Sequence, residues 1–395
     1  MTELVVLTGA ASGIGRAAAQ AFAARGNTCL LLDRDEAGLA KVAGTLPGQH
    51  HVLACDLTDP ASFGHIAATV AGLGRVQVVA NNAGMSDTSG IPMAEQTMDQ
   101  LDRLIALNLR APAALIGALR PHLAPAARVV NVSSGAGLRA IPFRGAYSPT
   151  KAGVIGLTHA LAASDPGLSA TALCPGYVRT ELVESLISAG RLDPAQAVTR
   201  VPLARMASPA EMAEALVFLA SPEAAPLNGQ ALSYDGGSSV FGGSISFNAA
   251  EAAAPVAMDT DTAFAVTGDD GLAGLLPASG GYEAQVDATA LTAGNAFAAV
   301  HSAAARFAKG GARPASLTLL LPPAPTDWIA AGDHAAAVMA TATLACEWGR
   351  SGLRINALEL RGPVAPQALA GVLSWVGGAR AQYLTGQVIP LGQAA

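Results

Sequence analysis

The feature that most constrains the fold is a run of glycines between a short apolar strand and an alanine-rich helix. Residues 3–8 (ELVVLT) are typical of a β-strand, residues 9–15 (GAASGIG) form the glycine run, and RAAAQAFAARG predicts a helix that ends at Gly26. Glycines at this place let the backbone approach a diphosphate, which the helix N-terminus binds through its free N–H groups and its dipole. The pattern predicts an α/β protein with a Rossmann-type, doubly wound parallel sheet.

A second predicted strand, CLLLD, ends at Asp33, eighteen residues after Gly15. An acidic residue at this point can hold both ribose hydroxyls of NAD and repels the additional phosphate of NADP. Arg34 follows directly and could accept that phosphate. The sequence therefore favours NAD and leaves NADP as the alternative.

The stretch from Asn131 to Lys151 brings three polar side chains to one place. RVVNVSS predicts a buried parallel strand, and Ser134 leaves its carboxyl end, where doubly wound sheets bind ligands. Tyr147 and Lys151 are four residues apart on a predicted helix and so share one face. The ammonium is expected to lower the pKa of the phenol, so that Tyr147 exchanges a proton with an alcohol or carbonyl oxygen that Ser134 also binds. The Tyr-x-x-x-Lys spacing alone also fits an exposed tyrosine beside a solvated lysine.

The motifs of the first 237 residues resemble, in type and order, those of the short-chain dehydrogenase/reductase family, in its compact single-domain branch. The glycine run matches the family's TGxxxGxG loop, residues 81–84 match its NNAG motif, and residues 175–180 match its PG-x-x-x-T segment. The resemblance implies four catalytic residues, Asn108, Ser134, Tyr147 and Lys151. It also implies these cofactor-binding residues: Gly9, Ser12, Gly13, Ile14, Gly15, Asp33, Arg34, Asp56, Leu57, Asn82, Ala83, Gly84, Tyr147, Lys151, Pro175, Gly176, Val178 and Thr180.

The resemblance further implies what these residues do. Asp56 is expected to meet the adenine, Asn108 to anchor a water molecule in a proton relay, and Lys151 to bind the nicotinamide ribose. Hydride would then pass between the nicotinamide and a carbon of a secondary alcohol or ketone beside Tyr147. The alternative is a catalytically silent nucleotide-binding sensor or scaffold, which would have no need of all four catalytic groups.

The sequence leaves the identity of the substrate open. A mainly apolar pocket is expected, covered by a lid over residues 180–206, and either Arg139 or Arg144 could meet a carboxylate or phosphate. Acyl thioesters, sugars, small cyclic alcohols and hydroxy acids all fit this description. The expected lining residues are Met85, Ser86, Gly135, Leu138, Ile141, Phe143 and Arg144.

Composition and charge narrow the class of partner. The net charge of −6 argues against nucleic acid or an anionic membrane as a partner, and a small-molecule alcohol or ketone is expected instead. The four cysteines and seven histidines show no metal-ligand spacing, so no metal site is expected. No basic leader precedes the first strand and no apolar run is long enough to span a membrane, so the sequence predicts a soluble, cytoplasmic protein.

At 395 residues the chain is too long for one such domain. Its last part resembles a degenerate second copy of the first domain. The predicted organisation is a catalytic domain at 1–240, a Gly/Ser/Ala-rich linker at 241–262 and a degenerate domain at 263–395. Residues 366–386 match residues 209–229 in length, and the pairs Leu216/Leu373 and Gly229/Gly386 share an offset of 157. Residues 263–271 (AFAVTGDDG) are interpreted in one of two ways. They form either the fourth strand of this copy or a degenerate counterpart of the first glycine loop.

The second copy is expected to have lost the chemistry of the first. At an offset of 183, Tyr147 falls on Ala330 and Lys151 on His334, and a proline lies near the Ser134 position. The hypothesis is a covalently attached, inactive partner, so that one chain is a pseudo-dimer and two chains form a homodimer that imitates a tetramer. The alternative is an appended module with packing of its own.

Overall fold

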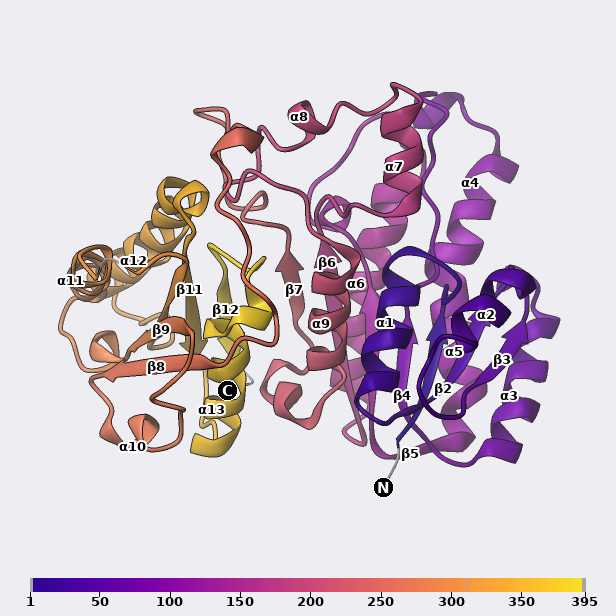
Figure 1. Ribbon diagram of the computed structural model, residues 1–395, viewed down its shortest axis with the longest axis horizontal. Coiled ribbons are helices and arrows are strands. Elements are labelled where there is room, and N and C mark those ends of the chain that lie inside the picture. Colours follow the sequence, from indigo (N-terminus) through magenta and orange to yellow (C-terminus); the bar gives the residue numbers. More distant parts are fainter. Residues whose placement is uncertain (1–2, 311, 393–395) are drawn as a thin grey trace. The chain divides into compact units, whose positions relative to one another are not determined.

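A computed structural model of the chain describes residues 3–310 and 312–392 (Figure 1). The chain divides into two compact units that interleave in sequence. The first comprises Met1–Glu184, Ser208–Ser221 and Asn228–Leu232. The second comprises Ser185–Ala207, Pro222–Leu227 and Ser233–Ala395. No helix of the described part is both long enough and apolar enough to cross a membrane.

The larger sheet has the strand order predicted for a Rossmann-type fold. Among the described residues its seven strands run β3-β2-β1-β4-β5-β6-β7, with parallel pairing from β3 through β6. The order reverses between β1 and β4, so the crevice at their carboxyl ends is the expected ligand site. The strands are β1 (Leu4–Thr8), β2 (Thr28–Asp33), β3 (His51–Ala54), β4 (Val76–Asn81), β5 (Leu123–Val132), β6 (Leu168–Pro175) and β7 (Ala231–Tyr234).

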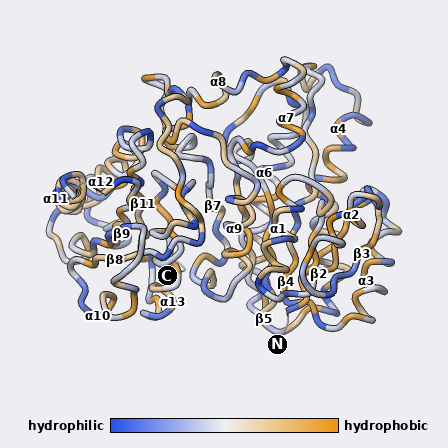
Figure 2. The backbone as a smooth tube through the Cα atoms, viewed as in Figure 1, coloured by the Kyte–Doolittle hydropathy of each residue, from blue (hydrophilic) through white to orange (hydrophobic). Residues whose placement is uncertain are grey.

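The central strands are apolar over most of their length, as Figure 2 shows for the tube at β4 and its neighbours. Residues 5–7 of β1 and 30–32 of β2 have no exposed surface. Such continuous apolar runs are typical of parallel strands that are covered on both faces. The covering helices of this unit are α1 (Gly13–Ala24), α2 (Glu36–Ala43), α3 (Ala61–Leu73), α4 (Met98–Ile105), α5 (Ala111–Leu119), α6 (Tyr147–Ser164) and α9 (Pro209–Leu219).

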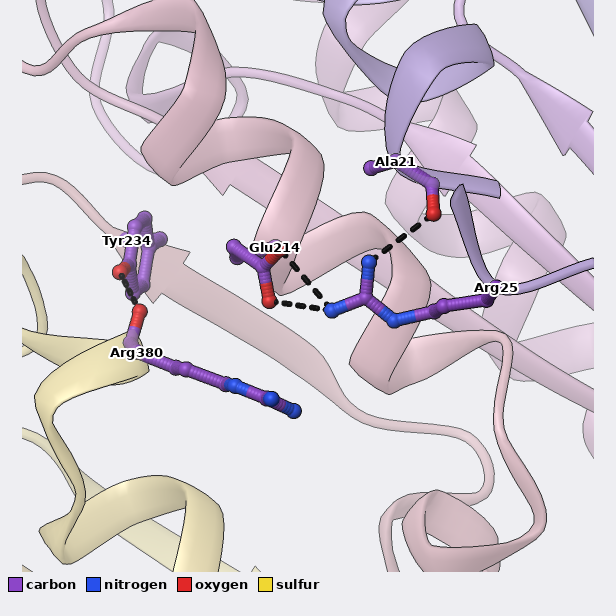
Figure 3. A network of polar contacts seen from close by, with 5 residues as sticks. All are labelled: Ala21, Arg25, Glu214, Tyr234 and Arg380. Atoms are coloured by element: carbon purple, nitrogen blue, oxygen red, sulfur yellow. Dashed lines mark hydrogen bonds and ion pairs between the residues drawn. The ribbon is translucent and has the colours of Figure 1, made fainter. Parts of the chain in front are cut away.

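Helices α1 and α9 pack together although they are nearly 200 residues apart in the chain. Arg25 at the end of α1 donates to both carboxylate oxygens of Glu214 on α9, at 2.7 and 2.9 Å, and to the Ala21 carbonyl at 2.9 Å (Figure 3). Ser208 caps α9 in a reciprocal capping box with Glu211. These contacts fix α9 against the helix that follows the glycine run.

The second unit contains a smaller parallel sheet. Its five strands within the described residues run β12-β11-β10-β9-β8. They are β8 (Thr262–Thr267), β9 (Tyr282–Asp287), β10 (Ala315–Leu321), β11 (Leu353–Leu360) and β12 (Val388–Leu391). The helices of this unit include α10 (Asp270–Ala273), α11 (Ala296–Ala308), α12 (Trp328–Trp348) and α13 (Pro366–Gly377).

The sheet order corrects one of the two placements expected for residues 263–271. The strand beside β10 is β9, so β9 occupies the place of a fourth strand and β8 does not. β8 is the edge strand beside β9, a position like that of β1 beside β4 in the larger sheet. Distance along the chain pointed to the wrong strand because the sequence does not show which strands are neighbours.

The segment predicted to form a substrate lid is packed within the second unit from Ser185 onward. It contains the second half of α7 (Glu181–Ser188) and the short α8 (Pro194–Ala197). The hydroxyl of Tyr383 donates to the Arg205 carbonyl at 2.9 Å, and the Arg205 guanidinium lies 4.9 Å from the centre of the Tyr383 ring. The Phe247 N–H donates to the Thr199 carbonyl at 3.0 Å. The second unit therefore holds this segment at several points.

Candidate active site

A cavity of about 790 Å³ lies in the first unit at the carboxyl ends of the strands of the larger sheet. It is lined by nearly all of the predicted cofactor residues and by three of the four predicted catalytic residues. Those that line it are Gly9, Ser12, Gly13, Ile14, Asp33, Arg34, Asp56, Leu57, Asn82, Ala83, Gly84, Ser134, Tyr147, Lys151, Pro175, Gly176, Val178 and Thr180. Gly15 and Asn108 are not among its lining residues.

The glycine run comes close to the segment that follows β4. A Cβ on Gly9, whose φ is +68°, would lie 2.9 Å from the Ala83 Cα, and one on Gly15 would overlap the Gly9 carbonyl oxygen. The Asn82 side-chain amide donates to the carbonyls of Thr8 and Gly9 at 3.1 and 3.2 Å. Because side chains are excluded here, a ligand can approach the backbone closely, and the residues present fit the diphosphate of a dinucleotide.

Two acidic residues lie at the end of the cavity expected for adenosine. The Asp33 carboxylate accepts from the N–H groups of Ala11 and Asp35, both at 3.1 Å, and so joins the end of β2 to the glycine run. Asp56 accepts from the backbone N–H and the hydroxyl of Thr58 at 2.8 and 2.7 Å. These two hydrogen bonds hold the pKa of the Asp56 carboxyl below its usual value.

Ser134 and Tyr147 meet at the opposite end of the cavity. Ser134 follows β5 and accepts from the Ala136 N–H at 3.1 Å. Burial raises the pKa of Tyr147, and a hydrogen bond with the Ser134 hydroxyl and the charge of Arg144 oppose that rise without cancelling it. The expectation that Lys151 lowers this pKa is therefore wrong for this structure, because the phenol is buried and the opposing cation is Arg144.

Lys151 is buried beneath the tyrosine. Its Nζ donates to the Val132 carbonyl at the end of β5 at 2.9 Å and lies 6.0 Å from the centre of the Tyr147 ring. Burial lowers the pKa of the ammonium to about 8. A Cβ on Gly84 would lie 3.2 Å from this Nζ, so glycine leaves the most room around the ammonium. In the Tyr-x-x-x-Lys pair, Lys151 is thus buried and Tyr147 half-buried, so the pair is not a solvated one.

Asn108 lies in a π-helical turn (Ala106–Arg110) between α4 and α5. Such turns are frequent at functional sites. Its amide nitrogen donates to the Met85 carbonyl at 2.9 Å and to the Thr150 hydroxyl at 3.2 Å, and its oxygen accepts from the Met85 N–H at 2.9 Å. The side chain of Asn108 therefore ties the segment after β4 to the helix that carries Tyr147 and Lys151.

The expected substrate pocket is placed correctly only in part. Met85 and Ser86 line the cavity, whereas Gly135, Leu138, Ile141, Phe143 and Arg144 are not among its lining residues. Leu138, Ile141 and Phe143 are 42, 44 and 58% exposed. The loop between β5 and α6 turns outward, and Arg144 donates to the Asp87 carbonyl at 3.2 Å. Apolar composition alone does not show which way a loop faces.

Several lining residues were missed by the sequence argument. The most informative is Glu181, whose carboxylate accepts from the Gly13 N–H at 3.0 Å. Its only sequence signal is its position directly after Thr180 in the PG-x-x-x-T segment. The others are Cys55, Thr58, Asp99, Asp102, Arg103, Ala106, Leu107, Val132, Ser133 and Tyr177, whereas the lining residues Leu182 and Val183 belong to the apolar face expected of the lid.

His334, which aligns with Lys151 in the second unit, is buried in a local polar contact. Its Nε2 lies 3.0 Å from the Pro322 carbonyl oxygen and 3.3 Å from Glu359 Oε1, and both side chains are about 5% exposed. Arg361 pairs with the other Glu359 oxygen at 2.5 Å. No group of His, Cys, Asp and Glu in the described residues could hold a metal ion.

Comparison with known proteins places this site in a family. Residues 9–239 match the family model described as enoyl-(acyl carrier protein) reductase. An uncharacterized short-chain type dehydrogenase/reductase, y4vI of Sinorhizobium fredii, is 37% identical over 238 residues. That match covers 60% of this chain and 43% of the relative, so this chain spans less than half of the relative's length.

Two further relatives are matched along nearly their whole length. The 2-(R)-hydroxypropyl-CoM dehydrogenase of Xanthobacter autotrophicus is 33% identical over 249 residues, which are 60% of this chain and 98% of the relative. The solved structure titled ElxO with NADP bound superposes with a TM-score of 0.56 at 26% identity, over 60% of this chain and 99% of that one. Through this part of its sequence, the chain belongs to the short-chain dehydrogenase/reductase family.

Proposed function

We propose that the chain is a nicotinamide-dependent oxidoreductase that interconverts a secondary alcohol and a ketone. The observation that carries the proposal is the meeting of Ser134, Tyr147 and Lys151 in the cavity that the glycine run also lines. A bound nicotinamide would supply the hydride or accept it. Tyr147 would give a proton to the carbonyl oxygen or take one from the alcohol, and Ser134 would hydrogen-bond that oxygen as its charge changes.

Lys151 and Asn108 support this chemistry without reacting themselves. Lys151 would hold the nicotinamide ribose and place a positive charge beneath the phenol. Asn108 would fix the distance between the segment after β4 and α6 and anchor a water molecule of a proton relay. Burial raises the pKa of Tyr147, so the phenol carries the proton that carbonyl reduction requires.

We further propose NAD over NADP, on the carboxylate of Asp33. Replacing Asp33 by Ser should tighten NADPH binding and weaken NADH binding, each by about tenfold, which corresponds to about 1.4 kcal/mol. The reason is that the substitution removes both the repulsion of the 2′-phosphate and the acceptor for the ribose hydroxyls. The measurement is a fluorescence titration of both cofactors, with Asp35→Ser as the control from the same turn. Tighter NADPH than NADH binding by the wild type would contradict the assignment.

For the second unit we propose a degenerate copy of the first that serves as an inactive partner, with domain boundaries at 240 and 263. The strand order supports a truncated copy, because β8 to β12 follow the order of β1, β4, β5, β6 and β7. A homodimer of such chains and a cytoplasmic location stay predictions from the sequence.

Removal of residues 241–395 should leave an insoluble or strongly destabilised fragment. The segment 185–207 would lose its partners, including the Tyr383 hydroxyl and the Phe247 N–H. The buried Tyr234 would lose the rings of Trp375 and Tyr383, each 5.8 Å away between centroids. Soluble yield, thermal unfolding and NADH binding of the fragment test the prediction. A soluble fragment with the cofactor affinity of the full chain would rule out the partner role.

A further inference from the structure

Glu181 places a negative charge at the N-terminus of α1. It is the first residue of α7, and its Oε2 accepts from the Gly13 N–H at 3.0 Å. Its other oxygen pairs with the guanidinium of Arg16 in the first turn of α1. A Cβ on Gly13 would lie 3.3 Å from the Thr180 side chain and 3.9 Å from Glu181 Oε2, so the two segments are in close contact.

The Gly13 N–H is one of the free donors that this fold offers to a cofactor diphosphate. Glu181 satisfies it with the same kind of group, an oxyanion. Partial burial opposes ionisation, but hydrogen bonds from its own backbone, from Arg16 and from Gly13 hold the pKa of the Glu181 carboxyl below its usual value. The side chain is therefore an anion at neutral pH, and a second anion at the same N–H is repelled.

We propose that Glu181 is an internal competitor of the cofactor diphosphate and thereby sets cofactor affinity. Binding must withdraw the carboxylate from the Gly13 N–H, which also frees the guanidinium of Arg16 to face the diphosphate. Leu182 and Val183 line the same cavity, so the withdrawal moves the first turn of α7 at the mouth of the site. The inference rests on the nicotinamide cofactor assigned to this family.

A purely stabilising role predicts different behaviour. The Arg16 and Glu181 side chains are 43 and 51% exposed, and ion pairs this open to water contribute little to stability. Replacing Glu181 is therefore expected to leave the fold intact. The loss of a stabilising contact would weaken cofactor binding or leave it unchanged, whereas the loss of a competitor strengthens it.

The test is the affinity of Glu181→Gln and Glu181→Ala for NADH, read from the fluorescence of NADH itself. Both variants should bind NADH about five- to tenfold more tightly than the wild type, since one negative charge at the diphosphate is removed. ADP-ribose carries the diphosphate without the nicotinamide. Its affinity, measured by displacement of NADH, should rise by the same factor. Adenosine, which has no phosphate, should show no gain.

The control variant is Glu184→Gln, three residues further along α7. The carboxylate of Glu184 pairs with Arg179 and not with the glycine run, so this variant should bind all three probes like the wild type. Thermal unfolding of each variant confirms that it is folded.

Each outcome decides the proposal. A gain for NADH and ADP-ribose that is confined to the Glu181 variants supports it. Unchanged or weaker binding by folded Glu181 variants, or an equal gain for adenosine or for Glu184→Gln, overturns it while the cofactor assignment stands. If neither the wild type nor any variant binds NADH or NADPH, the cofactor assignment fails and the proposal fails with it.

Discussion

Replacing Tyr147 by Phe should reduce turnover about 1,000-fold while NADH binding stays within about twofold of the wild type. The substitution removes only the hydroxyl that exchanges the proton and keeps the ring. The Ser134 hydroxyl and the Lys151 ammonium keep their backbone partners, the Ala136 N–H and the Val132 carbonyl. The measurement is the rate of NADH oxidation with any ketone from a panel that the wild type reduces, together with the NADH dissociation constant.

Tyr177→Phe is the matched control, because Tyr177 lines the same cavity and is 45% exposed. Its turnover should stay within about threefold of the wild type, as expected for a residue outside the proton-transfer group. Equal losses in the two variants would mean that both act through binding or folding. Full activity of Tyr147→Phe would remove the basis of the proposed reaction.

The parts of the site that the sequence predicted are those set by local pattern. A strand, a glycine run and a helix in succession determine the phosphate cradle, because close backbone approach at Gly9 and Gly15 excludes side chains. The spacing of Tyr147 and Lys151 predicted a shared helix face, and the structure places both at one cavity. Neither inference needed any knowledge of tertiary packing.

The parts that the sequence did not predict depend on tertiary packing. The pKa of Tyr147 follows from how deeply the phenol is buried and which cation lies beside it, and neither can be read from a four-residue spacing. The loop with Phe143 turns to solvent although it is apolar. Glu181 meets Gly13 across 168 positions of sequence, and no local pattern relates them. The place of β8 likewise required the order of the strands.

A buried arginine organises the second unit. Arg354 on β11 is 3% exposed, and its guanidinium donates to neutral oxygens. One nitrogen donates to the carbonyls of Ala381 and Leu384 at 3.0 and 2.9 Å, and the other to the Gly378 carbonyl at 2.9 Å and the Tyr282 hydroxyl at 3.1 Å. These acceptors lie just after α13 and on β9, so one side chain joins the sheet to the turn that precedes β12.

Replacing Arg354 by Met should lower the free energy of unfolding of the second unit by about 4 kcal/mol, since several buried carbonyls lose their donors at about 1–3 kcal/mol each. Lys should not rescue the loss, because an ammonium cannot reproduce the planar fork. Arg350→Met is the control, because Arg350 is half exposed and pairs with Glu251 at 3.0 Å. Its effect should stay within about 0.5 kcal/mol.

Urea unfolding followed by tryptophan fluorescence measures this effect selectively, because Trp328, Trp348 and Trp375 are the three tryptophans of the chain and all belong to the second unit. A change below about 1 kcal/mol in Arg354→Met would show that the carbonyls find other donors. NADH binding along the same urea series reports on the first unit. If binding is lost in the tryptophan transition, and both shift together in the variant, then the first unit depends on the second for its stability, as an attached partner requires. If NADH binding survives that transition, the second unit is a module that folds independently.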